Sequence, residues 1–152
     1  MKPRPMLAML AVLLTTFAAG DAGAQAPTLS ITSPTPGAAV KLGDDPEKTV
    51  DVVVAVSGFR LRAAGQCEGE AHCGHLHLRI DPQGASCNIP GRAYNSMNSD
   101  VGGEVVKAHF SYCPSPAGPH VIGVLLANDD HTPVIVDGRP VTAAVSVVAA
   151  TK

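Results

Sequence analysis

Six histidines provide the clearest chemical signal in the sequence, and two of them stand two residues apart. His75 and His77 lie in a segment, 75–81, that alternates polar and apolar residues. In a β-strand both imidazoles project from one face, opposite Leu76 and Leu78. Two imidazoles on one face can hold one metal ion, and imidazole ligands favour copper(II) or zinc(II) over magnesium or calcium. The same pair also fits a polar outer face paired with cross-strand neighbours.

The elements that must position these histidines are strands. Short β-branched runs alternate with Gly, Pro, Asn and Asp, and no segment has a helical period. The clearest run is Thr49–Ser57, in which four alternate valines line one face. Strands are expected at 28–33, 49–57, 75–81, 104–110, 119–128 and 139–149. We therefore expect an all-β fold, an antiparallel sandwich of about seven strands.

A long connection, residues 82–103, separates two of these strands. It is long enough for a short extra strand or a functional loop. Its segment Asn95–Asp100 has no chemical signature beyond hydrogen bonding, and we interpret it as solvated. Met97 would soften a nearby metal site toward copper(I), provided that the cysteines stay reduced.

The first 24 residues have the three parts of a secretory signal peptide. Lys2 and Arg4 precede an apolar stretch, 6–19, which small residues follow at 22–24. That stretch is shorter than the roughly 20 residues that a membrane-spanning helix requires. We expect cleavage after Ala24, a secreted or periplasmic location, and a single domain over 25–152 with no membrane span. No cysteine lies near the cleavage site, so a lipid anchor is not indicated.

Four cysteines are expected to form two disulfides, because export brings the chain into an oxidising compartment. Four cysteines allow three pairings. We favour Cys67 with Cys73, which closes a small loop, and Cys87 with Cys113, which joins two long connections. A zinc site built from cysteines is the alternative. No Cys-x-x-Cys pair is present, so a thioredoxin-like redox pair is not expected.

Composition and motifs exclude several classes of function. The 152 residues carry 11 Lys and Arg against 13 Asp and Glu, with no basic run to neutralise phosphates, so nucleic acid is not an expected partner. The sequence contains no His-Glu-x-x-His, no Gly-x-Ser-x-Gly and no phosphate-binding glycine-rich loop. We expect no enzymatic activity.

Several motifs give the chain a family resemblance. They are Thr32-Ser33-Pro34 with Gly37 and Val40, Val56-Ser57-Gly58-Phe59, Gly74-His75-Leu76-His77-Leu78 with Asp81, Gly118-Pro119-His120, and Asn128-Asp129-Asp130-His131. Together they resemble a group of exported bacterial immunoglobulin-like domains of unassigned function. The resemblance covers about Leu29 to Val148 and implies an Ig-like or fibronectin-III-like sandwich. The four cysteines depart from the simpler members, so a disulfide-stapled variant is expected.

That sandwich geometry ranks the candidates for a third metal ligand. If 75–81 and 119–128 are adjacent antiparallel strands, the first strand begins beside the turn 128–131 that follows the second. His131 is then the favoured third ligand, and His120 lies at the far end, beside Asp81. His72 ranks next because its loop can fold back over the pair. Asp130 is a candidate oxygen ligand or orienting acceptor.

Some residues of this set also have simpler interpretations, and three hypotheses for function remain open. His109 and His120 are the least expected ligands, and Asp129 or Asp130 can have the simpler role of capping turn amides.

The first hypothesis is an exported, non-enzymatic module with a binding or structural role in the cell envelope, where another envelope protein would be the partner. The alternative is a copper- or zinc-binding protein that uses His75, His77 and His131. A metal-dependent redox enzyme is the third, and it requires an open coordination position and a substrate pocket.

Overall fold

The computed structural model describes residues 25–84 and 87–151, so the expected signal peptide lies outside the described residues. Eleven strands and one 3-10 turn, η1 (Phe110–Tyr112), make up the described fold. The strands are β1 (Thr28–Ser33), β2 (Ala38–Lys41), β3 (Thr49–Ser57), β4 (Arg60–Leu61), β5 (Cys73–Ile80), β6 (Ser96–Met97), β7 (Val105–His109), β8 (Gly118–Asn128), β9 (Ile135–Val136), β10 (Arg139–Pro140) and β11 (Thr142–Ala150). No helix among these residues is long and apolar enough to cross a membrane.

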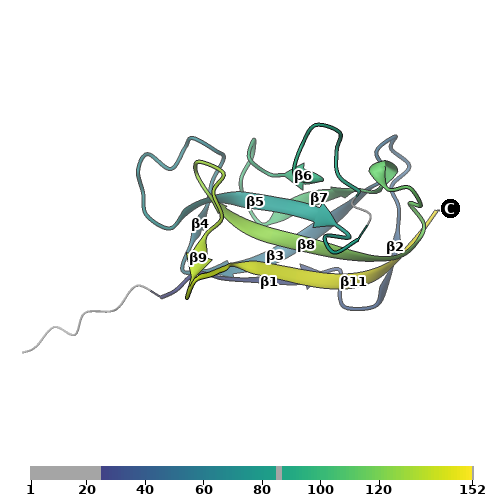
Figure 1. Ribbon diagram of the computed structural model, residues 1–152, viewed down its shortest axis with the longest axis horizontal. Coiled ribbons are helices and arrows are strands. Elements are labelled where there is room, and N and C mark those ends of the chain that lie inside the picture. Colours follow the sequence, from purple (N-terminus) through teal and green to yellow (C-terminus); the bar gives the residue numbers. More distant parts are fainter. Residues whose placement is uncertain (1–24, 85–86, 152) are drawn as a thin grey trace, which may run out of the picture.

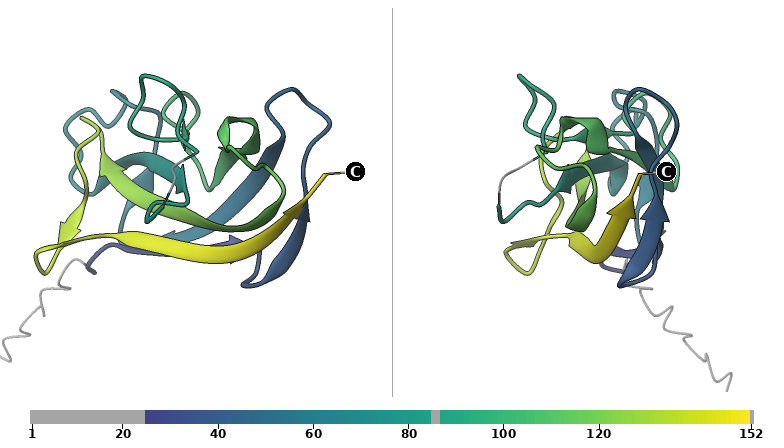
Figure 2. Two further views of the ribbon diagram at one scale, coloured as in Figure 1. Left: turned by 45° about the vertical axis from the view of Figure 1, so that its right-hand side comes forward. Right: turned by 90° about the vertical axis from the view of Figure 1, so that its right-hand side faces the viewer.

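Two curled sheets face each other and form an all-β sandwich (Figures 1 and 2). One sheet has the order β1-β3-β7, and the other runs β2-β11-β8-β5-β4, with β6 paired to β5. A separate two-stranded hairpin joins β9 and β10. The expected all-β sandwich is therefore confirmed, although its sheets are not purely antiparallel. β2 pairs with β11 in parallel, and so does β4 with β5.

The core lies between the sheets and consists of aliphatic side chains from both. Alternation in β3 buries Val52 and Val54, as its valine pattern predicts. Fully buried partners from the other sheet and from β7 are Leu76, Leu78, Ile80, Val106, Ala108, Ile122, Val124 and Leu126. Burial of such side chains is the main favourable term in folding. The inward face of β5 is thus fixed by the core, which leaves its other face for the histidines.

Two disulfides staple the loops around this core. They join Cys67 to Cys73 and Cys87 to Cys113, the pairing that the sequence analysis favours. Among the residues described, no cysteine is free. The thiolates that a cysteine zinc site would need are therefore absent from this structure.

The segment 95–100 is not solvated as expected, because two of its asparagines are buried. Asn95 donates from Nδ2 to the carbonyls of Cys87 (2.5 Å) and His109 (2.9 Å), and its Oδ1 accepts the His109 N–H. Asn98 accepts the Leu76 N–H at 2.6 Å and donates to the Gly103 carbonyl. Buried amides of this kind fix loops that lack a regular ladder. The long connection is thereby attached to β5 and β7.

We expect Asn95→Ala to lower the free energy of unfolding by about 2–4 kcal/mol, because it leaves the His109 N–H and the Cys87 carbonyl buried without partners. Asn88→Ala is the control, since Asn88 makes one 3.2 Å bond to the Ala93 carbonyl in the same loop. Urea unfolding monitored by circular dichroism measures both. Equal losses in the two variants would contradict the role assigned to Asn95.

Candidate metal centre

Three histidines converge at the start of β5. His75 Nε2 lies 2.9 Å from His77 Nε2 and 2.9 Å from His131 Nδ1, and the third side of the triangle, His77 to His131, is 3.2 Å. His75 and His77 are almost fully buried, whereas His131 is exposed. Three ring nitrogens within this distance form a group that could hold a metal ion.

Strand pairing explains why His131 arrives here. β5 and β8 are antiparallel neighbours, with Gly74 opposite Asn128 and His75 opposite Ala127. The turn after Asn128 therefore begins beside the histidine pair, as expected from the sequence. Gly74 permits this approach, because a Cβ at that position would clash with the Ala127 carbonyl oxygen.

The turn that carries His131 is held by its own polar side chains. Asp130 Oδ1 accepts hydrogen bonds from the backbone N–H and the hydroxyl of Thr132, and those bonds lower the Asp130 pKa. Asn128 Nδ2 donates to the Thr132 hydroxyl at 3.0 Å. Asp129 Oδ1 accepts the Gly65 N–H at 2.6 Å, which joins the turn to the disulfide loop before β5. Both aspartates therefore accept hydrogen bonds from backbone amides in this structure.

The distances suit a metal ion bound to imidazole. An ion bound to all three nitrogens would need metal–nitrogen bonds of about 2.0–2.1 Å, and the separations between the nitrogens allow such bonds. The three imidazoles would fill three coordination positions, so a four-coordinate ion would need one further ligand.

Electrostatics keeps the buried histidines in the form that binds metal. Burial, together with the nearby His75 and His131, lowers the pKa of His77 from 6.5 to about 4. Burial is also the main cause of the lowered pKa of His75, which His131 lowers further and Asp129 raises. At neutral pH both rings are therefore uncharged, as a ligand imidazole must be. Their Nδ1 atoms are buried and have no partner among the described residues.

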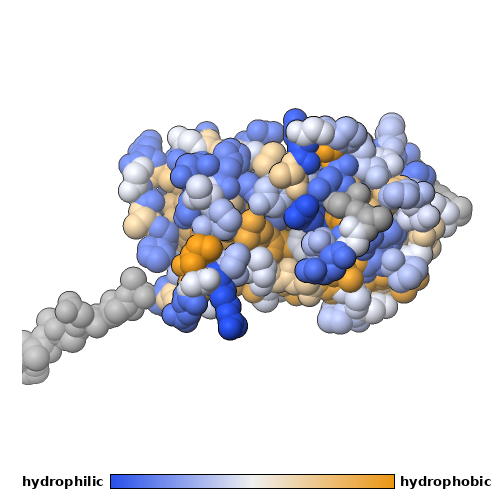
Figure 3. Space-filling view, in the orientation of Figure 1, coloured by the Kyte–Doolittle hydropathy of each residue, from blue (hydrophilic) through white to orange (hydrophobic). Residues whose placement is uncertain are grey.

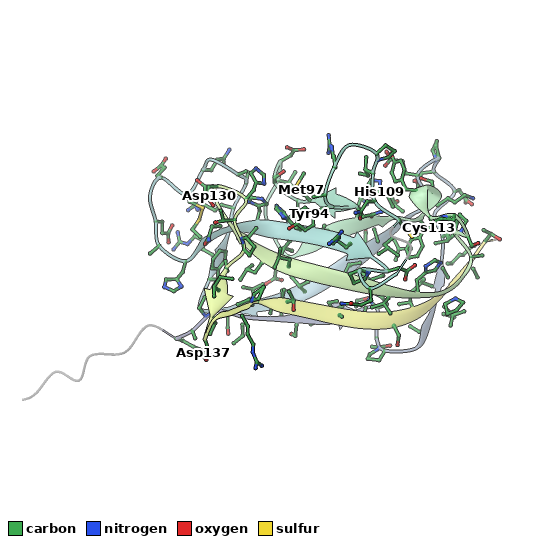
Figure 4. All side chains as sticks on the ribbon, viewed as in Figure 1. Tyr94, Met97, His109, Cys113, Asp130 and Asp137 are labelled. Carbon is green, nitrogen blue, oxygen red and sulfur yellow. A yellow bond between two sulfur atoms is a disulfide. The ribbon has the colours of Figure 1, made fainter. Side chains whose placement is uncertain are left out.

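Tyr94 covers the pair from the long connection, and Figure 4 shows it over β5. Its ring centroid lies 4.2 Å from that of His77, and the rings are tilted by 51°. The guanidinium of Arg79 lies 5.9 Å from the same Tyr94 ring. Sequence reasoning missed Tyr94 and the anchoring Asn98, because neither belongs to a periodic segment.

The remaining candidates lie outside the cluster. His72 is exposed, with a positive φ of 56°, and Asp130 is occupied by Thr132. His109 Nδ1 lies 3.0 Å from Glu47 Oε2. His120 Nδ1 lies 2.7 Å from Asp81 Oδ2, beside Asp81 as expected. A second group, Cys87, Cys113 and His120, also has close ligand atoms, but its two sulfurs are joined to each other.

Comparisons with known proteins add little to this geometry. No family model matches the chain, and no curated protein matches it. Among solved structures, the endo-β-1,4-mannanase from Thermotoga petrophila is similar at 12% identity, with a TM-score of 0.40. The match covers 84% of this chain, which spans only 20% of that one. A likeness this weak carries no argument about function.

We expect the metal-free protein to lose stability as the pH falls from about 6.5 to about 4. The unfolded chain takes up a proton at position 77 near the ordinary pKa of 6.5, whereas the folded protein does so only near 4. The unfolded state then binds more protons, so stability is full above this window and declines through it. Thermal unfolding at a series of pH values measures the loss.

His77→Gln should have a smaller loss of Tm between pH 7 and pH 5 than the unchanged protein. His72→Gln is the matched control because His72 is exposed, and it should leave the pH profile as it is. An unchanged profile in His77→Gln would show that His77 does not carry the effect.

Proposed function

We propose that this protein is an exported metal-binding protein that holds one copper(II) or zinc(II) ion with His75, His77 and His131. The observation that carries the proposal is the triangle of ring nitrogens, with sides of 2.9, 2.9 and 3.2 Å. An N–H on one of these rings can donate to a neighbouring ring nitrogen at this distance, whereas a cation can accept the lone pairs of all three nitrogens at once. A metal ion is therefore the occupant that uses the whole set.

The donor set selects the kind of metal. All three ligands are imidazoles, which suit copper and zinc, whereas calcium and magnesium prefer oxygen. Of the divalent ions in the first transition row, copper(II) binds a given nitrogen site most tightly. The disulfides support export to an oxidising compartment, where copper(II) rather than copper(I) is the expected state. Copper(II) is accordingly the preferred ion, with zinc(II) second.

The exported Ig-like domains that the motifs resemble provide the proposed setting. A β-sandwich needs no metal to fold when its core is well filled, as it is here. The metal would therefore bind a preformed scaffold, and the protein would handle metal outside the cytoplasm. If no metal bound, the alternative function would be that of a structural or binding module of the cell envelope.

Titration of the oxidised protein, residues 25–152, with copper(II) and with zinc(II) should give one tightly bound equivalent. His131→Gln and His77→Gln should each weaken binding by at least about 100-fold, because each removes one of three protein ligands. His120→Gln is the control, since His120 is also buried but lies beside Asp81. It should leave the affinity for metal unchanged.

Calorimetry and metal analysis after gel filtration provide the measurement. Equal weakening in His131→Gln and His120→Gln would contradict the ligand set. If the unchanged protein bound metal no more tightly than His77→Gln does, the proposed function would be overturned.

A further inference from the structure

A groove of about 410 Å³ lies beside the proposed metal site, and of the three proposed ligands His77 lines it. The floor of this groove is the outward face of β5, β8 and β11. Register places Arg79 opposite Gly123, which in turn lies opposite Ala144. Residues directly opposite one another share a face, so two small residues follow the arginine across the sheet. They add little side-chain bulk to the sheet face at that level, where a Cβ at Gly123 would lie 3.4 Å from Pro82 Cγ.

The walls of the groove are mainly apolar and include no carboxylate. Outside the strands of the floor, they comprise Pro82, Gln83, Tyr94, Pro133 and Pro140. Hydrophobic surface is visible over the middle of β8 in Figure 3, between more hydrophilic regions. A groove of this size and character suits a small organic molecule.

Arg79 is the charged residue of this groove, and no acidic partner for it is found in residues 25–84 and 87–151. Its Nε is buried without a hydrogen-bond acceptor in that same part of the chain. Its guanidinium lies against the Tyr94 ring, which limits where the side chain can point. An oriented guanidinium without a partner is suited to a carboxylate, to which Arg can donate two hydrogen bonds.

The proposed metal adds a second positive charge at the His77 end. His77 and Arg79 are two residues apart in β5, so they lie on the same face. A metal held by three histidines keeps an open coordination position, which an oxygen ligand can complete. A guanidinium inside an apolar groove without acidic residues, with a metal ion beside the same groove, defines an anionic ligand with an apolar body.

We propose that the groove binds a small organic carboxylate, whose carboxyl group meets Arg79 and the metal ion and whose apolar part lies over Gly123 and Ala144. This inference rests on the proposed function, because the metal supplies one of the two charges. Benzoate is the probe, and benzyl alcohol is its uncharged counterpart of similar size.

The test uses the copper-loaded protein, residues 25–152, with binding followed by calorimetry and by the electron paramagnetic resonance spectrum of copper(II). Benzoate should bind and change the copper spectrum, and benzyl alcohol should bind at least about tenfold more weakly. Arg79→Gln should weaken benzoate binding about 10- to 100-fold while keeping the affinity for copper. Arg92→Gln is the matched control, because Arg92 is exposed in the long connection and does not line the groove.

Equal binding of benzoate and benzyl alcohol, or an unchanged benzoate affinity in Arg79→Gln, would overturn the inference. So would a benzoate affinity that is the same with and without copper, since the metal would then take no part. These failures are distinct from failure of the proposed function, which the copper titration of the same samples measures on its own. Circular dichroism of Arg79→Gln separates lost binding from lost folding.

Discussion

The convergence of three imidazole nitrogens is the constraint on which the rest of this structure depends. Their separations of 2.9–3.2 Å allow a hydrogen bond between rings, and they also allow all three nitrogens to bind one cation. Two of the rings are buried, so water cannot screen them, and burial opposes protonation. Without a metal, the rings can hydrogen-bond to one another, and the fold keeps their nitrogens within reach of a shared ion.

The strand that carries the pair is fixed on both of its faces. Leu76 and Leu78 are fully buried in the core, while His75 and His77 are buried on the outward side. Asn98 binds the backbone N–H of Leu76, between the two histidines, so the edge of β5 is fixed at the site itself. Rigid placement of this kind lowers the cost of binding, because the ligands need not be ordered first.

Period-two alternation, together with the antiparallel adjacency of 75–81 and 119–128 that an Ig-like sandwich implies, was enough to predict the central geometry. They put His75 and His77 on one face, brought the turn at His131 to them, and placed His120 beside Asp81, and the structure confirms all three placements. The cover over the histidines could not be predicted in this way. Tyr94, Asn95 and Asn98 come from a connection with no periodicity, and their positions are set by tertiary contacts.

The same distinction explains the strands that the sequence analysis missed. β2, β4 and β9 have two to four residues each, too few for a pattern to be recognised. The parallel pairing of β2 with β11 depends on how the chain turns after Pro34, which local propensity does not specify. Long strands with one buried face specify their own register, whereas short edge segments take theirs from neighbours.

Charge balance connects the metal centre to the groove. Neutral histidines bring no negative charge to a divalent ion, and Arg79 adds a further positive charge two residues along the same strand. A carboxylate ligand from the protein would strengthen the binding of a divalent ion at this site. The nearby Asp129 and Asp130 are engaged with backbone amides instead. Asp129 keeps its charge and raises the pKa of His75, so it offsets part of the positive charge, and the open side of the three-histidine set is where a further anion can bind.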